Sequence, residues 1–176
     1  MIRNWLLPSI MGIAMAIAAY QGTLLATPYV LMSAAMKKIG AQTPANSFRF
    51  GEPSTADNQP IVRPSPDLSY SSCVFDVSKG PVLVDAGPVP GSYWSLSIFD
   101  ARTDVAQVLS ERETGDGAAR VMLIRDGIKL AAPDGYTPVR LQYDKGIALV
   151  RILVGSKADY PAIDAIRRKA RCRLME

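Results

Sequence analysis

The sequence predicts a mainly β protein: an antiparallel β-sandwich of jelly-roll type with one N-terminal transmembrane helix and a C-terminal amphipathic helix. Three observations support this fold class. An uncharged apolar run opens the 176-residue chain, short β-branched and aromatic runs follow between turn signals, and apolar residues recur at helical spacing near the end. We therefore divide the chain into an anchor (1–37), an extended proline-rich linker (38–66) and a β-sandwich domain with its C-terminal helix (67–176).

The first segment has the composition of a membrane span. No charged residue occurs between Trp5 and Met36, and a bilayer core needs only about 20 apolar helical residues. We expect the span to cover Leu6–Ala26, with Thr27-Pro28 bending the chain near the surface. Two other interpretations are a cleaved signal peptide and a soluble core helix. We favour a retained anchor, because a signal peptide has a shorter apolar core of roughly 7–15 residues and core helices are rarely so uniformly apolar.

One face of this helix consists of small residues. Gly12, Ala16, Ala19 and Thr23 follow one another at helical spacing. Small side chains let two helices approach closely in lipid, so this face is a candidate helix-packing surface for other membrane-protein subunits. The alternative is that small residues are simply common in such anchors.

Strands are expected wherever a short apolar run lies between turn signals. In the run 93–99, Trp94, Leu96 and Ile98 share one face and serines separate them, which is typical of a strand with one face in a core. Asp126-Gly127 separates two such runs and is a candidate two-residue hairpin. The predicted strands are Tyr70–Val77, Val82–Asp85, Tyr93–Phe99, Val105–Leu109, Arg120–Ile124, Ile128–Ala131, Val139–Tyr143 and Ile147–Val154.

The last segment changes to a helical period. Asp159 is a candidate N-cap, with Pro161 in the first turn. We expect this helix to pack on the sandwich, with its cations complementing the C-terminal dipole, although contact with anionic lipid headgroups is an alternative. The predicted apolar stripe is Ile163, Ile166, Ala170 and Leu174, and the predicted basic face is Arg167, Arg168, Lys169, Arg171 and Arg173.

The two cysteines leave two states open. Cys73 falls in a predicted strand and Cys172 near the end of the predicted helix, without the C-x-x-C spacing of redox or zinc motifs. They form either a disulfide, which an oxidising compartment would favour, or two buried thiols, as expected in the cytosol. A disulfide would join the terminal helix to the sheet.

The charges and the missing histidine exclude several function classes. The net charge of +4 comes from the first 50 residues (Arg3, Lys37, Lys38 and Arg49), and the remainder is neutral, which argues against a nucleic-acid-binding domain. Without histidine there is no Ser-His or Cys-His nucleophile pair and the commonest metal ligand is missing. We therefore expect no metal and no cofactor.

The densest polar cluster precedes the first long predicted strand. Arg63, Asp67 and Tyr70 place a guanidinium, a carboxylate and a phenol near one strand start, and together they can bind a carboxylate-bearing ligand. The alternative is a structural ion pair that fixes how the linker enters the sheet.

Three blocks of sequence resemble a known family. They are Arg63-Pro64-Ser65-Pro66-Asp67 with Tyr70-Ser71, then Phe75-Asp76-Val77-Ser78-Lys79-Gly80-Pro81, then Pro90-Gly91-Ser92-Tyr93-Trp94-Ser95-Leu96-Ser97-Ile98-Phe99-Asp100. They are similar to the R-x-N-P-D-x-x-Y-S, D-L-S-x-G-P and Y-W-S-L-x-x-x-D stretches of the domain of unknown function 1254 family. The likeness extends more weakly over residues 40–172.

The resemblance implies a location. Small members of this family in proteobacteria look like inner-membrane proteins with one N-terminal helix and a β domain in the periplasm. We accordingly expect a single-pass protein whose N-terminus is cytoplasmic, an orientation that the flanking charges do not decide. This chain departs from the family in having Ser65 where Asn is frequent, and we expect it to lack the second β domain of larger relatives.

The sequence thus favours a non-catalytic periplasmic domain that is held in the lipid bilayer and binds other proteins, as an accessory subunit of a larger inner-membrane complex. The alternative is a small-ligand-binding or hydrolytic domain that uses the Arg63, Asp67 and Tyr70 pocket.

Overall fold

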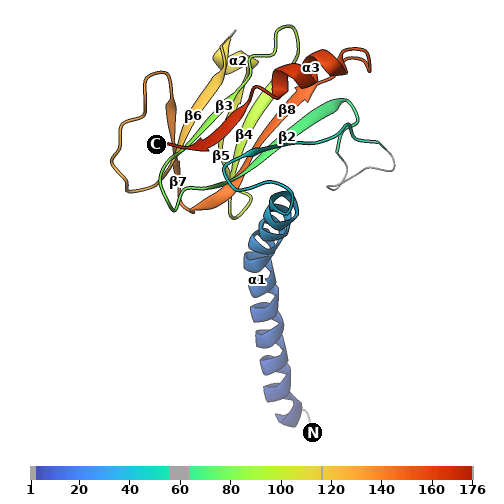
Figure 1. Ribbon diagram of the computed structural model, residues 1–176. Helices are drawn as coiled ribbons and strands as arrows, with labels where there is room; N and C mark the ends of the chain where they lie inside the picture. Colours follow the sequence, from blue (N-terminus) through green and yellow to red (C-terminus); the bar gives the residue numbers. More distant parts are fainter. Residues whose placement is uncertain (1–2, 56–63, 116, 176) are drawn as a thin grey trace.

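The first element is one long helix, α1 (Arg3–Gly40). The computed structural model describes residues 3–55, 64–115 and 117–175 of the chain. At 1.5 Å per residue α1 is about 57 Å long, almost twice the thickness of a bilayer core. Its apolar stretch is long and apolar enough to cross a membrane, and no part of the most apolar window is buried. Figure 1 shows α1 projecting from the β domain, with the N-terminus at the far end.

The helix continues through Pro28, where we expected the chain to bend. Proline removes one backbone hydrogen bond, which neighbouring groups can offset. The Thr27 hydroxyl donates to the Thr23 carbonyl at 2.7 Å. Beyond the proline, Met32 and Ile39 are buried against the β domain. This packing holds the last turns of α1 in helical form.

The larger sheet has five strands in the order β1-β2-β8-β4-β5, and all its neighbours are antiparallel. Alternate residues of β2 are buried, so Cys73 and Phe75 mark the inner face of this sheet, and Tyr70 and Ser72 its outer face. β1 lies within the segment predicted to be a linker. The strands are β1 (Phe48–Phe50), β2 (Leu68–Asp76), β4 (Trp94–Asp100), β5 (Val105–Ser110) and β8 (Lys145–Leu153).

The smaller sheet has the order β7-β6-β3-β9. β6 and β7 run parallel while the other pairs are antiparallel, so the sheet is mixed, where the sequence predicted antiparallel strands throughout. The strands are β3 (Val82–Ala86), β6 (Ala119–Arg125), β7 (Thr137–Leu141) and β9 (Arg171–Leu174), and a short helix, α2 (Glu111–Thr114), precedes β6.

The hairpin predicted at Asp126-Gly127 is wrong, and Ile128–Ala131 is not a strand. A parallel pair needs a crossover, and the segment after Gly127 supplies it by passing over the outer side of the smaller sheet. There Ala132 and Tyr136 cover an apolar patch of the sheet, which the turn signal alone did not indicate. The patch consists of Leu83, Met122 and Ile124.

The C-terminal helix is shorter than predicted. α3 (Tyr160–Arg167) ends after two turns, and the residues from Arg171 onward form β9 beside β3. The cause is a competing partner: β3 has a free edge that the chain end can pair with. Pro161 lies in the first turn as expected, but the Asp159 side chain makes no capping hydrogen bond and accepts one from the Ser156 hydroxyl instead.

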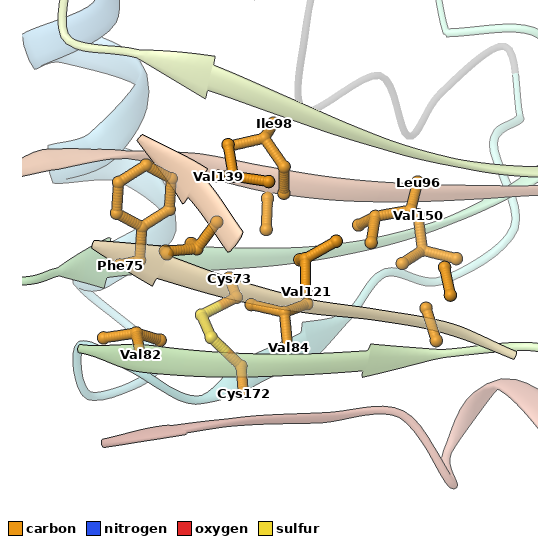
Figure 2. Close-up of a cluster of buried hydrophobic side chains, with 14 of the residues drawn as sticks. Cys73, Phe75, Val82, Val84, Leu96, Ile98, Val121, Val139, Val150 and Cys172 are labelled. Carbon is orange, nitrogen blue, oxygen red and sulfur yellow. A yellow bond between two sulfur atoms is a disulfide. The ribbon is translucent and has the colours of Figure 1, made fainter. Parts of the chain in front are cut away.

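One hydrophobic core lies between the two sheets. Its main cluster combines inner-face residues of both sheets, among them Phe75, Leu96 and Val121, and Trp94 and Ile98 point into it as predicted. Figure 2 shows a disulfide crossing this core. It joins Cys73 on β2 to Cys172 on β9, with an S–S distance of 2.05 Å, so it connects the larger sheet to the smaller one.

Candidate functional site

The structure describes two of the three residues that the sequence grouped as a ligand site. Arg63 lies outside the described residues. Asp67 is exposed just before β2, and its carbonyl accepts a hydrogen bond from the Val154 N–H at 2.8 Å. Tyr70 lies on the outer face, and its hydroxyl accepts a hydrogen bond from the Ser65 N–H at 2.9 Å. Of the two described residues, Tyr70 lines the cavity described next and Asp67 does not.

A cavity of about 730 Å³ lies where the end of α1 meets the outer face of the larger sheet. Phe99, Ile147 and Leu149 supply an apolar floor. The volume falls within the range of roughly 300–1,000 Å³ that is typical of small-molecule sites. The other lining residues come from α1 and the following turn (Ala35, Lys38, Ile39, Gln42, Thr43), from β1 and the segment after it (Arg49, Phe50, Gly51, Glu52, Ser54), and from Pro64, Tyr70 and Ser72.

Two sets of contacts hold α1 against the larger sheet. Met32 and Ile39 pack with Ile147 in a second apolar cluster. Nearer the N-terminus of α1, the Tyr29 and Tyr143 hydroxyls share a hydrogen bond at 2.9 Å, and the Arg102 guanidinium lies 5.5 Å from the Tyr29 ring centroid. The end of α1 is therefore a wall of the site.

Two arginines of the outer face are half-buried without a carboxylate partner. Arg49 lies opposite Ser72 on β1, and Arg151 lies opposite Tyr70 on β8. Among the described residues neither arginine forms an ion pair. Arg151 donates one long hydrogen bond, of 3.3 Å, to the Ser97 hydroxyl, and its Nε is buried with no partner.

The most connected side chain of the domain is Arg167, which the sequence placed on an exposed basic face. It is only 3% exposed. Its Nη2 donates to the Gly51 carbonyl and the Tyr160 hydroxyl at 2.8 Å, its Nη1 donates to the Tyr70 carbonyl at 2.9 Å, and its Nε donates to Asp164 at 2.6 Å. Because Gly51 and Tyr70 line the cavity, Arg167 fixes part of the cavity wall.

The sequence did contain a signal for this role. Arg167 lies four positions after Ile163, so helical spacing puts it on the same stripe as the apolar residues. Arg168 and Lys169 of the predicted basic face are exposed at the end of α3. Arg171 and Arg173 are exposed on β9 instead, where Arg171 Nη1 donates to the Arg168 carbonyl at 2.9 Å.

Asp164 ties this corner together electrostatically. Burial raises the pKa of its carboxyl, but hydrogen bonds from Arg168 and Arg167 outweigh that effect and leave the pKa below its usual value. Arg168 binds the second carboxylate oxygen at 2.7 Å.

Figure 1 shows α3 at the end of the β domain that lies away from α1. The lipid-headgroup interpretation of this helix is therefore disfavoured, because α3 lies far from the membrane that α1 would cross.

A second polar cluster lies on the outer side of the smaller sheet. The Tyr136 hydroxyl donates to Asp85 at 2.7 Å, and Arg173 Nη1 donates to the other oxygen of Asp85 at 2.7 Å. Burial and the hydrogen bond to Asp85 raise the pKa of Tyr136. These groups satisfy one another, so we assign the cluster to holding the crossover segment on the sheet.

The predicted helix-packing residues lie on the exposed part of α1. Gly12, Ala16, Ala19 and Thr23 are all solvent-exposed, and no atom lies within 4 Å of a Cβ built on Gly12. The Thr23 hydroxyl donates to the Ala19 carbonyl at 2.8 Å and is satisfied within the helix.

Residues 45–174 match the family described as "Protein of unknown function (DUF1254)". The chain belongs to the DUF1254 family. The resemblance drawn above from residues 63–100 is thereby confirmed. No curated protein matches the chain. The DUF1254 family description names no activity, so the function must be argued from the site.

Two solved structures are similar to this DUF1254 chain. One is the VPA0106 protein from Vibrio parahaemolyticus, with 17% sequence identity, a TM-score of 0.67, and coverage of 86% of this chain and 35% of that chain. The other is an uncharacterized protein from Burkholderia cenocepacia, with 18% identity, a TM-score of 0.48, and coverage of 79% and 38%. The first likeness supports the fold. The chain spans little more than a third of either structure.

Proposed function

We propose that this DUF1254 protein is a single-pass inner-membrane protein whose β domain, a two-sheet sandwich, lies in the periplasm and binds a small, mostly apolar ligand without catalysis. The observation that carries the proposal is the cavity of about 730 Å³ between the end of α1 and the larger sheet. Its walls come from the anchor, from β1 and from β2, β4 and β8. Residues far apart in the sequence thus converge on one concave, largely apolar space, as expected of a ligand site.

Two features support the membrane and the compartment. The exposed surface of α1 from Trp5 to Leu25 is rich in large apolar side chains, which are costly to leave in water but suit a bilayer. The Cys73–Cys172 disulfide fits an oxidising compartment such as the periplasm. Mass spectrometry of the mature chain and protease treatment of spheroplasts test both points. A chain that lacks residues 1–26, or a β domain protected from protease in intact spheroplasts, would contradict the assignment.

The ligand site can be tested on the full chain in phosphatidylcholine nanodiscs. The probe is a neutral long-chain alcohol with an alkyl diazirine, and mass spectrometry locates the residues that it labels after illumination. We expect labelling at the end of α1 (35–43) and at Ile147–Leu149 in β8, because the apolar floor and the helix wall lie there.

Matched variants separate cavity binding from labelling through the bilayer. Ala35→Phe and Ser72→Phe add bulk to two lining residues and should abolish labelling at both places. Val108→Phe makes a similar change on the exposed strand β5 and should leave labelling unchanged. Labelling that survives both cavity substitutions would refute the proposed site, provided that each variant unfolds at the temperature of the control.

A second candidate function is the protein interaction that the sequence favoured. The exposed small-residue face of α1 supports this function, because none of the described residues covers Gly12, Ala16, Ala19 and Thr23. Native mass spectrometry after mild detergent extraction tests it. A stable complex that Ala16→Leu disrupts and Ile17→Leu does not would support an accessory subunit, and a lone monomer under all conditions would argue against one.

A further inference from the structure

We propose that the ligand of this cavity is an anionic amphiphile: a hydrocarbon chain that lies on the apolar floor, with a carboxylate or phosphate head held by Arg49 and Arg151. The inference rests on the proposed function, since it names the chemical class that the same cavity takes.

The first observation is a contrast among the cations of the chain. Among the described residues, the lysines and arginines that lack an ion pair are exposed, with the exceptions of Arg49 and Arg151. The other partly or fully buried arginines, which are Arg102, Arg125 and Arg167, each pair with a carboxylate. Burying a guanidinium without an anion costs free energy, and no carboxylate of the described residues offsets that cost for Arg49 or Arg151. Such a cost is expected where an anionic ligand completes the site.

The second observation is that the two arginines lie on the two strands that flank β2. β1 and β8 lie on either side of β2, each at about 4.8 Å, so Arg49 and Arg151 stand on both sides of Tyr70 and Ser72 on the outer face. Arg49 lines the cavity, whereas Arg151 lies beside the lining residue Tyr70 and donates to Ser97 on β4. To share one anion with Arg49, the Arg151 side chain must turn from Ser97 toward β2. Arginine forks bind carboxylate and phosphate oxygens in pairs.

The surrounding groups complete an amphipathic site. Lys38 adds a third cation from the last turn of α1, where it also faces the negative end of the helix dipole. Among the described residues that line the cavity, Glu52 is the one carboxylate. Cations thus outnumber anions around the head position, while Ile147 and Leu149 offer the chain an apolar surface.

The position of the cavity bears on where the amphiphile comes from. If the membrane span ends near Ala26, the first lining residue, Ala35, lies about 13 Å further along the helix. The headgroup layer adds only about 5–8 Å to each side of the bilayer core. The site therefore stands above the headgroups and takes either a monomer from the aqueous phase or a lipid that has partly left the bilayer.

The experiment extends the photolabelling to matched head groups. Diazirine probes with one common chain carry a carboxylate, a quaternary ammonium or a neutral hydroxyl, and labelling of the full chain in phosphatidylcholine nanodiscs is titrated. We expect the carboxylate probe to reach half-maximal labelling at a concentration about ten times lower than the ammonium probe, which corresponds to about 1.4 kcal/mol. Nanodiscs that contain phosphatidylglycerol test the source: reduced labelling means that the lipid itself occupies the site, and unchanged labelling means that free monomers do.

Arginine variants supply the control. Arg49→Gln and Arg151→Gln should each weaken labelling by the carboxylate probe about tenfold and leave the neutral probe unaffected, whereas Arg140→Gln, an exposed arginine of the smaller sheet, should change neither. Because the native charges are unpaired, both variants should unfold at the wild-type temperature or above it. Equal half-maximal concentrations for all heads would overturn the anionic class but leave the cavity standing. No labelling by any probe would overturn the proposed function itself.

Discussion

Arg167 offers the sharpest test of how this domain is held together. We expect Arg167→Met to destabilise the β domain by about 3–5 kcal/mol, the usual cost of breaking a buried ion pair. The substitution keeps the length of the side chain but removes every donor. The Gly51 and Tyr70 carbonyls lose the hydrogen bonds that Arg167 donates, and Asp164 loses one of its two arginine partners.

The neighbouring arginine provides a control within the same helix. Arg168 also binds Asp164 at 2.7 Å, but its side chain is 56% exposed, so Arg168→Met should destabilise the domain far less than Arg167→Met. Unfolding of the full chain in nanodiscs can be followed by the fluorescence of Trp94, which is buried in the core, in a Trp5→Phe background.

The expected difference is large enough to measure. A loss of 3–5 kcal/mol lowers the melting temperature of a domain of this size by on the order of 10–20 °C. We argue that the buried hydrogen bonds of Arg167 stabilise this end of the β domain. Equal losses of stability for the two substitutions would refute this argument, and so would a loss below about 1 kcal/mol for Arg167→Met. Arg167→Lys should restore only a part of the stability, because a lysine cannot reproduce the planar fork.

Three further predictions follow from the fold. Reduction of the Cys73–Cys172 disulfide, which closes a loop with a sequence separation of 99, should cost about 4–5 kcal/mol in the chain-entropy model; equal denaturation midpoints with and without reductant would contradict this. The native pKa of Asp164 is lowered, so its contribution to stability is present above the unfolded pKa of about 3.9 and is lost as pH falls through the native value. The stability difference between wild type and Asp164→Asn should therefore be constant near neutral pH and shrink below about pH 4. A difference that does not vary with pH would show that the charge of the Asp164 carboxylate does not contribute to stability. Gly146→Ala should prevent folding of the β4–β8 pair, because its Cβ would meet the Phe99 carbonyl oxygen; soluble, cooperatively unfolding protein would show that the backbone can shift there.

The sequence indicated the elements of this protein more reliably than their partners. The alternation around Trp94 placed β4 correctly, because the period of a strand is a local property of the chain. The charge-free run predicted α1 for the same reason. The family likewise followed from short local blocks between residues 63 and 100.

The errors came where a distant partner decided between two local options. A helix and a strand were both open to the segment after Lys169, and the free edge of β3 selected the strand. The Asp126-Gly127 turn was compatible with a hairpin, but the apolar patch around Met122 needed cover, and the chain crossed over it instead. Pro28 was expected to bend a helix that packing against Ile147 keeps regular.

The candidate site depends almost wholly on tertiary structure. Sequence proximity suggested Arg63, Asp67 and Tyr70. Of the two that the structure describes, Tyr70 lines the cavity and Asp67 does not, because successive residues of an extended chain point to opposite faces. Arg49 and Arg151 are about a hundred residues apart, and only the pairing of β1 and β8 with β2 brings them together. Local patterns record the period and polarity of each segment, and these determined the helix and most strands. Which faces meet, and which charges are left without a partner, are properties of the packed chain alone.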